Sequence, residues 1–329
     1  MRETGAVVKL RSPAVRWLVK IGIAFVAFYL LARSTDLAQL RALLRVLPVG
    51  SLFISLGILT LSVTLTARAW QTLLAAQGIG LRLYEVGRLY MVGLFFAAFT
   101  PAGAGGDAVR IRGVYRYTLR AGDSVASNVI LRILSFSALL IVGSAGYLAN
   151  RDLPGTRLSL LVLLAVAAGL LGISRIERTT RRFARLLPTA RLTDWAEQAL
   201  TSFYLFRAHP GALAGSGGLL LLAQMVAAIS AYPLARGLGL DIPLEWFLAV
   251  IPLARLASYI PITPSGAGVY EGVAVLLFSH LGVAPHAAFA LALLDDAVLL
   301  TASLMGGIFC LADRGPRSKV TTATEEALG

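Results

Sequence analysis

Charged side chains are scarce in this sequence. They make up 14% of the 329 residues, whereas a typical soluble domain has about 25%. Apolar residues account for 57% of the chain, and the mean hydropathy is +0.77. This composition excludes a disordered chain, a coiled coil and an ordinary cytosolic enzyme. It is typical of a helical protein that crosses a membrane several times.

Cysteine and histidine are also rare. The single cysteine, Cys310, cannot form a disulfide within the chain. Cysteine usage therefore does not indicate whether the protein faces an oxidising or a reducing compartment. The three histidines, His209, His280 and His286, do not have the spacing of metal ligands. The sequence has no phosphate-binding loop, no nucleophile elbow and no dinucleotide-binding motif. We therefore expect no metal, no cofactor and no enzymatic activity.

Long apolar runs are abundant instead. A membrane-spanning helix takes about 20 mostly apolar residues. Six segments meet this requirement: 17–33, 49–67, 124–149, 157–173, 211–235 and 287–312. We therefore predict an all-α membrane bundle with six full spans.

Two shorter apolar stretches end in matching Pro-Gly motifs. Residues 84–100 run into Thr100-Pro101-Ala102-Gly103-Ala104-Gly105, and residues 244–260 run into Thr263-Pro264-Ser265-Gly266-Ala267-Gly268. Proline and clustered glycine stop helices, and a second short stretch follows each motif, at 106–119 and 269–281. This pattern predicts two re-entrant hairpins, whose breaks are tolerated at membrane depth where protein covers them or where they line a wet cavity.

The net charge of +13 is explained by topology. With the N-terminus inside and both hairpins re-entrant, 22 of the 30 Lys and Arg residues fall inside and 6 outside, and Arg132 and Arg255 lie within apolar stretches. This distribution agrees with the positive-inside rule. A full crossing by 84–100 would place four arginines outside and fits the rule less well. We expect a multi-pass membrane protein with cytoplasmic termini and no nucleic-acid partner.

The expected organisation has three parts. Residues 1–16 form a cytoplasmic segment, 17–312 the membrane domain, and 313–329 a cytoplasmic tail. Within the domain, the stretch 174–210 interleaves arginines with apolar residues, which is typical of helices lying on anionic headgroups. A loop that merely follows the positive-inside rule explains it equally well.

The two Pro-Gly motifs indicate an internal repeat. They match at five of six positions, lie 163 residues apart, and are each followed by an acid, Asp107 or Glu271. The predicted topology makes the hairpins enter from opposite sides, so repeat one (about 49–149) and repeat two (about 211–312) are inverted. This architecture is typical of secondary transporters, although duplicated membrane enzymes also exist.

A first set of candidate binding residues surrounds the first motif. The glycines Gly103, Gly105 and Gly106 lead into Asp107 and Arg110, which share one face if a helix begins here. The free N–H groups of a helix start, together with an arginine, suit the phosphate of a lipid headgroup. The alternative is a helix cap with a local ion pair.

A second candidate is a polar stripe in segment 124–149. Ser124, Asn128, Arg132 and Ser135 recur at helical spacing on an otherwise apolar helix. Because an arginine inside a membrane is costly, we expect Asn128 and Arg132 to bind substrate or to pair with a charge. Ordinary hydrogen bonding between helices is the alternative.

The remaining candidates lie in the second half. Arg255, Gly266, Gly268 and Glu271 surround the second motif, and we expect Glu271 to pair with Arg132 or Arg255, or alternatively to carry a proton. Asp295 and Asp296 lie about 100° apart on a helix and so should not share one face. One of them is expected to pair with an arginine, and a coupling role for cations or protons is a further possibility.

These motifs resemble a known family. Gly-Leu-Phe-Phe at 93–96, Thr-Pro-Ala-Gly-Ala-Gly-Gly-Asp at 100–107 with Arg110, and Thr-Pro-Ser-Gly-Ala-Gly-Val-Tyr-Glu at 263–271 are similar to the lysylphosphatidylglycerol synthase transmembrane-domain family. That family forms the flippase-like membrane half of bacterial multiple peptide resistance factors. The resemblance covers roughly 15–312, and Arg132 matches the arginine expected after the first motif.

The resemblance implies a flippase that moves a phospholipid, an aminoacyl-lipid or a lipid-linked glycan between leaflets, with membrane lipids as its partners. The sequence departs from the family at Asp295 and Asp296, near the position where an arginine is usual. Only 18 residues follow Leu311, so we expect no lysyl transfer by this chain. The alternatives are a membrane subunit of a separately encoded aminoacyl- or glycosyl-transferase and an ion-coupled solute transporter.

Overall fold

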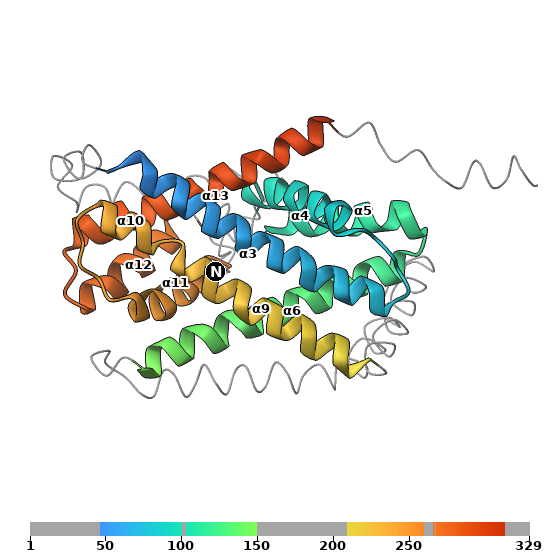
Figure 1. Cartoon of the computed structure of the whole chain (residues 1–329), viewed down its shortest axis with the longest axis horizontal. Coiled ribbons are helices and arrows are strands. Elements are labelled where there is room, and N and C mark those ends of the chain that lie inside the picture. Colours follow the sequence, from blue (N-terminus) through green and yellow to red (C-terminus); the bar gives the residue numbers. More distant parts are fainter. Residues whose placement is uncertain (1–46, 101–102, 150–208, 260–265, 267, 313–329) are drawn as a thin grey trace, which may run out of the picture.

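A computed structural model describes residues 47–100, 103–149, 209–259, 266 and 268–312 of the chain. Every regular element in these residues is an α-helix (Figure 1). The all-α prediction is therefore confirmed for this part of the protein. Several sequence predictions lie outside the described residues: the spans 17–33 and 157–173, the end segments 1–16 and 313–329, and the interfacial stretch up to residue 208.

Four long apolar stretches of helix form the frame of the bundle. They are α3 (Val49–Ala76), α6 (Ala121–Ala149), α9 with α10 (Pro210–Ile229 and Tyr232–Gly237), and α13 (Pro285–Ala312). They contain the predicted segments 49–67, 124–149, 211–235 and 287–312. With 27 to 29 residues each in their apolar stretch, they reach about 40 Å at 1.5 Å per residue, more than the hydrocarbon core of about 30 Å.

The first Pro-Gly motif separates two short helices that form a hairpin. These are α4 (Leu83–Ala98) and α5 (Ala104–Thr118). They run antiparallel and pack through small residues: a Cβ placed on Gly106 would lie 2.4 Å from the carbonyl oxygen of Gly93, and one on Gly113 would meet Leu89. Glycine is therefore required for the two backbones to come this close.

The second motif likewise separates α11 (Leu244–Ser258) from α12 (Val269–His280), and these two helices pack together. Gly266 and Gly268 have φ angles of +76° and +82°, in the left-handed region that glycine adopts without strain. A Cβ on Gly266 would also lie 2.4 Å from the Cβ of Ser258. The glycines of the motif are thus explained by backbone conformation and by close packing.

The hairpins occupy opposite halves of the bundle. In Figure 1, α4 and α5 lie toward one end and α10, α11 and α12 toward the other, while α3 and α13 run between them. The α3 helix packs on α9, α6 on α11, and α13 on α4. Small residues permit the last two contacts, because a Cβ on Gly146 would meet the backbone of Leu248 and one on Gly306 would meet that of Met91.

Two apolar cores follow this division. One contains Phe247, Tyr270 and Phe278 with the first half of α13, and the other contains Trp70, Leu73 and neighbouring residues of α4 and α6. Ring pairs such as Phe247 and Phe278, whose centroids lie 5.7 Å apart, fill the first core. Each hairpin therefore contributes to the core at its own end of the bundle.

The Gly106 contact leads to a stability prediction. Replacing Gly106 with alanine should destabilise the protein by about 1–3 kcal/mol, because the backbone of α4 has no room for the added methyl group. Gly218 of α9 is the matched control, since a Cβ there meets nothing within 4 Å. Its replacement by alanine should leave the Tm unchanged or raise it. Thermal denaturation of the detergent-purified variants measures both, and equal Tm values would contradict the contact.

Candidate functional site

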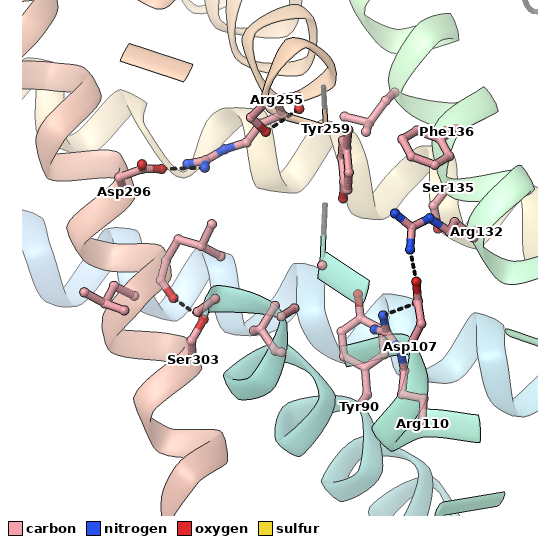
Figure 2. Close-up of a pocket in the computed structure, with 18 of the residues that line it drawn as sticks. Tyr90, Asp107, Arg110, Arg132, Ser135, Phe136, Arg255, Tyr259, Asp296 and Ser303 are labelled. Carbon is pink, nitrogen blue, oxygen red and sulfur yellow. Dashed lines mark hydrogen bonds and ion pairs between the residues drawn. The ribbon is translucent and has the colours of Figure 1, made fainter. Parts of the chain in front are cut away.

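A cavity of about 660 Å³ lies where the two hairpins approach each other (Figure 2). Its walls come from α4, α5, α6, α11 and α13, with Gln224 contributed by α9. The lining includes seven residues predicted from the sequence: Gly103, Asp107, Arg110, Asn128, Arg132, Arg255 and Asp296. Residues nearly 200 positions apart in the chain thus meet in one space.

Asp107 is the hub of the first charged cluster. It lies in the first turn of α5, directly after the Pro-Gly break. Its Oδ1 accepts hydrogen bonds from Nη2 of Arg110, at 2.9 Å, and from Nδ2 of Asn128, at 3.1 Å. Its Oδ2 is paired with Arg132. One carboxylate therefore holds two arginines and an amide.

The helical register explains how these groups converge. Arg110 follows Asp107 by three positions, so both point to the same side of α5. Asn128 and Arg132 are four positions apart on α6, which packs against α5. The polar stripe predicted on 124–149 therefore faces Asp107. Of the two acids suggested as partners of Arg132, Asp107 and Glu271, the structure pairs it with Asp107.

Aromatic rings hold both arginines of this cluster. The guanidinium of Arg110 lies 5.0 Å from the ring centre of Tyr90, and that of Arg132 lies 5.5 Å from Phe136 and 5.7 Å from Tyr259. The rings of Phe136 and Tyr259 are in contact, with centroids 4.7 Å apart. Sequence reasoning missed these rings. The only local signal was the four-residue spacing of Arg132 and Phe136.

Arg255 of α11 organises the second charged cluster. Its Nη1 donates to Asp296 at 2.5 Å, and its Nη2 binds Asp295. Both adjacent acids thus pair with one arginine, where the sequence led us to expect a pair with one of them. A guanidinium presents donors in a broad planar fork, so carboxylates that diverge from one helix can each bind a different nitrogen of it.

Tyr270 completes the second cluster. Its hydroxyl donates to Asp295 at 2.5 Å, and its ring lies 3.8 Å below the guanidinium of Arg255. Tyr270 is fully buried, as is most of Asp295. Tyrosine was not among the predicted site residues, although it directly precedes Glu271 in the second motif.

Glu271 has a different place from the predicted one. Its Oε2 accepts a hydrogen bond from the backbone N–H of Gly268, at 2.7 Å, at the start of α12. This is the geometry of a helix cap. Arg132 is paired with Asp107, and Arg255 with Asp295 and Asp296, so Glu271 serves first to hold the break between α11 and α12 in shape.

The predicted glycines also divide by role. Gly103 lines the cavity. Gly105 lies against Thr100, whose Oγ1 accepts a hydrogen bond from the Gly105 N–H at 2.9 Å, and Gly106 lies against α4. Gly266 and Gly268 shape the second break. Of the five glycines, only Gly103 thus lines the cavity, and the other four permit the close packing and the backbone turns around it.

Two polar atoms in the cavity wall have no hydrogen-bond partner within the described residues. They are Oδ1 of Asn128 and Nε of Arg110. The orientation of the Asn128 amide is fixed because its other end donates to Asp107. Buried polar groups are normally satisfied, so these two atoms keep an unused acceptor and an unused donor beside Asp107.

The exposed charges of the cavity are of opposite sign. The side chains of Arg132 and Asp296 are 32% and 29% exposed, whereas Asp295 is 6% exposed. Six leucines from α4, α6 and α13 contribute to the apolar part of the wall, namely Leu94, Leu131, Leu139, Leu293, Leu299 and Leu300. The cavity is therefore amphipathic. Within the described residues, no three side chains of His, Cys, Asp or Glu gather as a metal site would require.

A double-mutant cycle tests the Asp107 hub. We expect Asp107→Asn and Arg132→Gln to show a coupling free energy above about 1 kcal/mol, because removing one member of a buried pair leaves the other uncompensated. The matched control is the exposed pair Arg236 and Asp241, whose side chains are 53% and 96% exposed and whose coupling should fall below about 1 kcal/mol. Chemical unfolding in mixed micelles measures both cycles. Equal coupling would contradict the hub.

Comparison with known proteins agrees with this architecture. A search of curated proteins found no match. The family model described as the lysylphosphatidylglycerol synthase TM region matches residues 17–306, which include both Pro-Gly motifs, all described helices up to the last turns of α13, and every charged residue of the cavity. The chain is therefore a membrane protein that belongs to the lysylphosphatidylglycerol synthase transmembrane-region family.

Proposed function

We propose that this protein moves a polar or anionic lipid between the two leaflets of the bacterial inner membrane. The observation that carries the proposal is the amphipathic cavity between the hairpins, where three arginines and two acids share the lining with a wall of leucines. A headgroup would occupy the charged part and the acyl chains the apolar part. A phospholipid, an aminoacyl-lipid and a lipid-linked glycan all have this division.

The short helices support re-entrant hairpins. The helices α4, α5, α11 and α12 have 12 to 16 residues, or about 18–24 Å at 1.5 Å per residue, which is less than the hydrocarbon thickness of about 30 Å. Their breaks line or adjoin the cavity. Such non-helical backbone is compatible with membrane depth only in this setting.

The packing supports an inverted repeat. Val49 and Pro210 begin the first long helix of each half and lie 161 positions apart, as do Ala76 and Gly237 at the ends. Each helix contact also has a counterpart: α6 packs on α11 as α13 packs on α4, and α5 packs on α6 as α12 packs on α13. If the two halves are exchanged, each of these helix contacts maps onto another one, as a two-fold axis between the halves requires.

We propose that transport works by exchange of ion pairs. A phosphate that enters the cavity competes with Asp107 for Arg110 and Arg132, and the released hairpin then changes its position against the long helices. Charged groups at membrane depth are costly without partners, so the hub is stable only when either Asp107 or a headgroup neutralises the arginines. The headgroup shifts the equilibrium between the arrangement in which Asp107 holds the arginines and the one in which it has released them, because it binds the two with different affinity.

The proposed orientation places Arg120 inside and Asp241 outside. Exposed arginines gather at the Arg120 end of the described bundle, where Arg68, Arg82, Arg112 and Arg116 also lie, in accordance with the positive-inside rule. In a Cys310→Ser background, Asp241→Cys should react with a membrane-impermeant maleimide in intact spheroplasts, and Arg120→Cys only after permeabilisation. Labelling of both from one side would exclude this orientation.

Lipid movement is tested directly in proteoliposomes. Vesicles of phosphatidylcholine carry trace phosphatidylglycerol or phosphatidylethanolamine with a fluorophore on the acyl chain, and dithionite reports which label reaches the outer leaflet. The protein should accelerate at least one of them over protein-free vesicles. Arg132→Gln should slow this movement by about tenfold or more, because a charged hydrogen bond to phosphate contributes about 1.5–3 kcal/mol.

The control for this experiment is Arg120→Gln, which removes an arginine whose side chain is 75% exposed at the end of the bundle. It should move lipid at the parent rate. If neither lipid moves faster than in protein-free vesicles, the proposed function is wrong for these headgroups. If Arg132→Gln and Arg120→Gln behave alike, the cavity is not the route.

A further inference from the structure

The C-terminal end of α11 lies between the two charged clusters. Arg255 belongs to the last turn of this helix, and Tyr259 is the residue that ends it. Both side chains line the cavity, and Figure 2 shows Tyr259 between Arg255 and Arg132. Residues four positions apart on a helix lie on the same side of it. One helical turn therefore presents side chains to both clusters.

Arg255 joins this turn to α12 and α13. Its guanidinium binds both Asp295 and Asp296 of α13, and the ring centre of Tyr270 of α12 lies 3.8 Å from it. Its backbone carbonyl accepts a hydrogen bond from Oγ of Ser258, at 2.7 Å, within the same turn. The second cluster thus sets the position of the turn.

Tyr259 joins the same turn to α6. Its ring centre lies 5.7 Å from the guanidinium carbon of Arg132, and its ring contacts that of Phe136, with centroids 4.7 Å apart. Arg132 is in turn the partner of Asp107. Of the two rings on Arg132, Phe136 belongs to α6 itself, so Tyr259 is the ring that reaches this arginine from another helix. A movement of α11 therefore changes the surroundings of Arg132.

We propose that Tyr259 is a positioning residue that couples the two charged clusters. The contacts form a continuous series from Asp296 through Arg255 and the turn of α11 to Tyr259 and Arg132. When the acids of α13 release Arg255, the turn loses its anchor, and Tyr259 no longer holds Arg132 in place for Asp107. A change at one cluster thus alters the other. This coupling belongs to the protein itself and holds whatever the cavity binds.

A double-mutant cycle between the clusters measures this coupling. Arg132→Gln and Asp296→Asn each change the unfolding equilibrium constant, and for independent sites the combined effect equals the product of the single effects to within about twofold. We expect a departure of more than about threefold from that product, because either change loosens the same turn. Chemical unfolding of the purified full-length protein in mixed micelles gives the constants. A product that holds to within twofold overturns the inference.

Three ring variants identify the route of the coupling. When the cycle is repeated in a Tyr259→Leu background, the departure should vanish, whereas Tyr259→Phe, which keeps the ring, should retain it. Phe136→Leu is the matched control, since it removes the ring that shares a helix with Arg132, and it should also retain the departure. If the departure persists with Tyr259→Leu, or is lost equally with Phe136→Leu, Tyr259 is not the coupling residue.

The proteoliposome assay adds a readout that stability alone does not move. Tyr259→Leu should slow lipid movement about threefold or more, as expected for the loss of a cation–π contact to Arg132, and Tyr259→Phe should restore it. A Tyr259→Leu rate equal to that of the parent contradicts the positioning role. If the parent moves no lipid, the proposed function fails, whereas the unfolding cycle still decides whether the clusters are coupled.

Discussion

A carboxylate shared by two arginines is the interaction on which this structure depends. Asp107 pairs with both Arg110 and Arg132 in a part of the molecule where an unpaired charge would be costly. Because the two arginines come from different helices, the shared acid also fixes how α5 and α6 lie against each other. The helix α5 begins directly after the Pro-Gly break, which places Asp107 of its first turn in the wall of the cavity.

The second half pairs its charges across a different helix contact. There the long helix α13 supplies the acids and the short helix α11 supplies the arginine, whereas in the first half the long helix α6 supplies an arginine and the short helix α5 the acid. Each cluster therefore joins a short helix to a long one, with the acid and the arginine on opposite sides of the contact.

The sequence predicted interactions within one helix better than interactions between helices. The Asp107 and Arg110 contact follows from their spacing, as does the common face of Asn128 and Arg132. The partner of Arg132 could not be derived in this way, because Asp107 and Glu271 are both acids after a Pro-Gly break and only the packing of α5 on α6 distinguishes them. The aromatic rings beside the arginines were missed for the same reason: phenylalanine and tyrosine are common in any membrane helix.

The contact between Gly146 and Leu248 has a consequence for the backbone of α11. Pro252 lies inside this helix and has no N–H, so the carbonyl of Leu248 loses the donor that would normally bind it. Gly146 of α6 presents its Cα to that carbonyl, since a Cβ there would lie 2.7 Å from the Leu248 oxygen, and a Cα–H group is a weak donor. The last turn of α11, which carries Arg255 and Tyr259, therefore follows a point of the helix where one backbone hydrogen bond is absent. Proline inside a helix is a common site of bending, so Pro252 is the point at which the end of α11 that carries Arg255 can turn away from the rest of the helix.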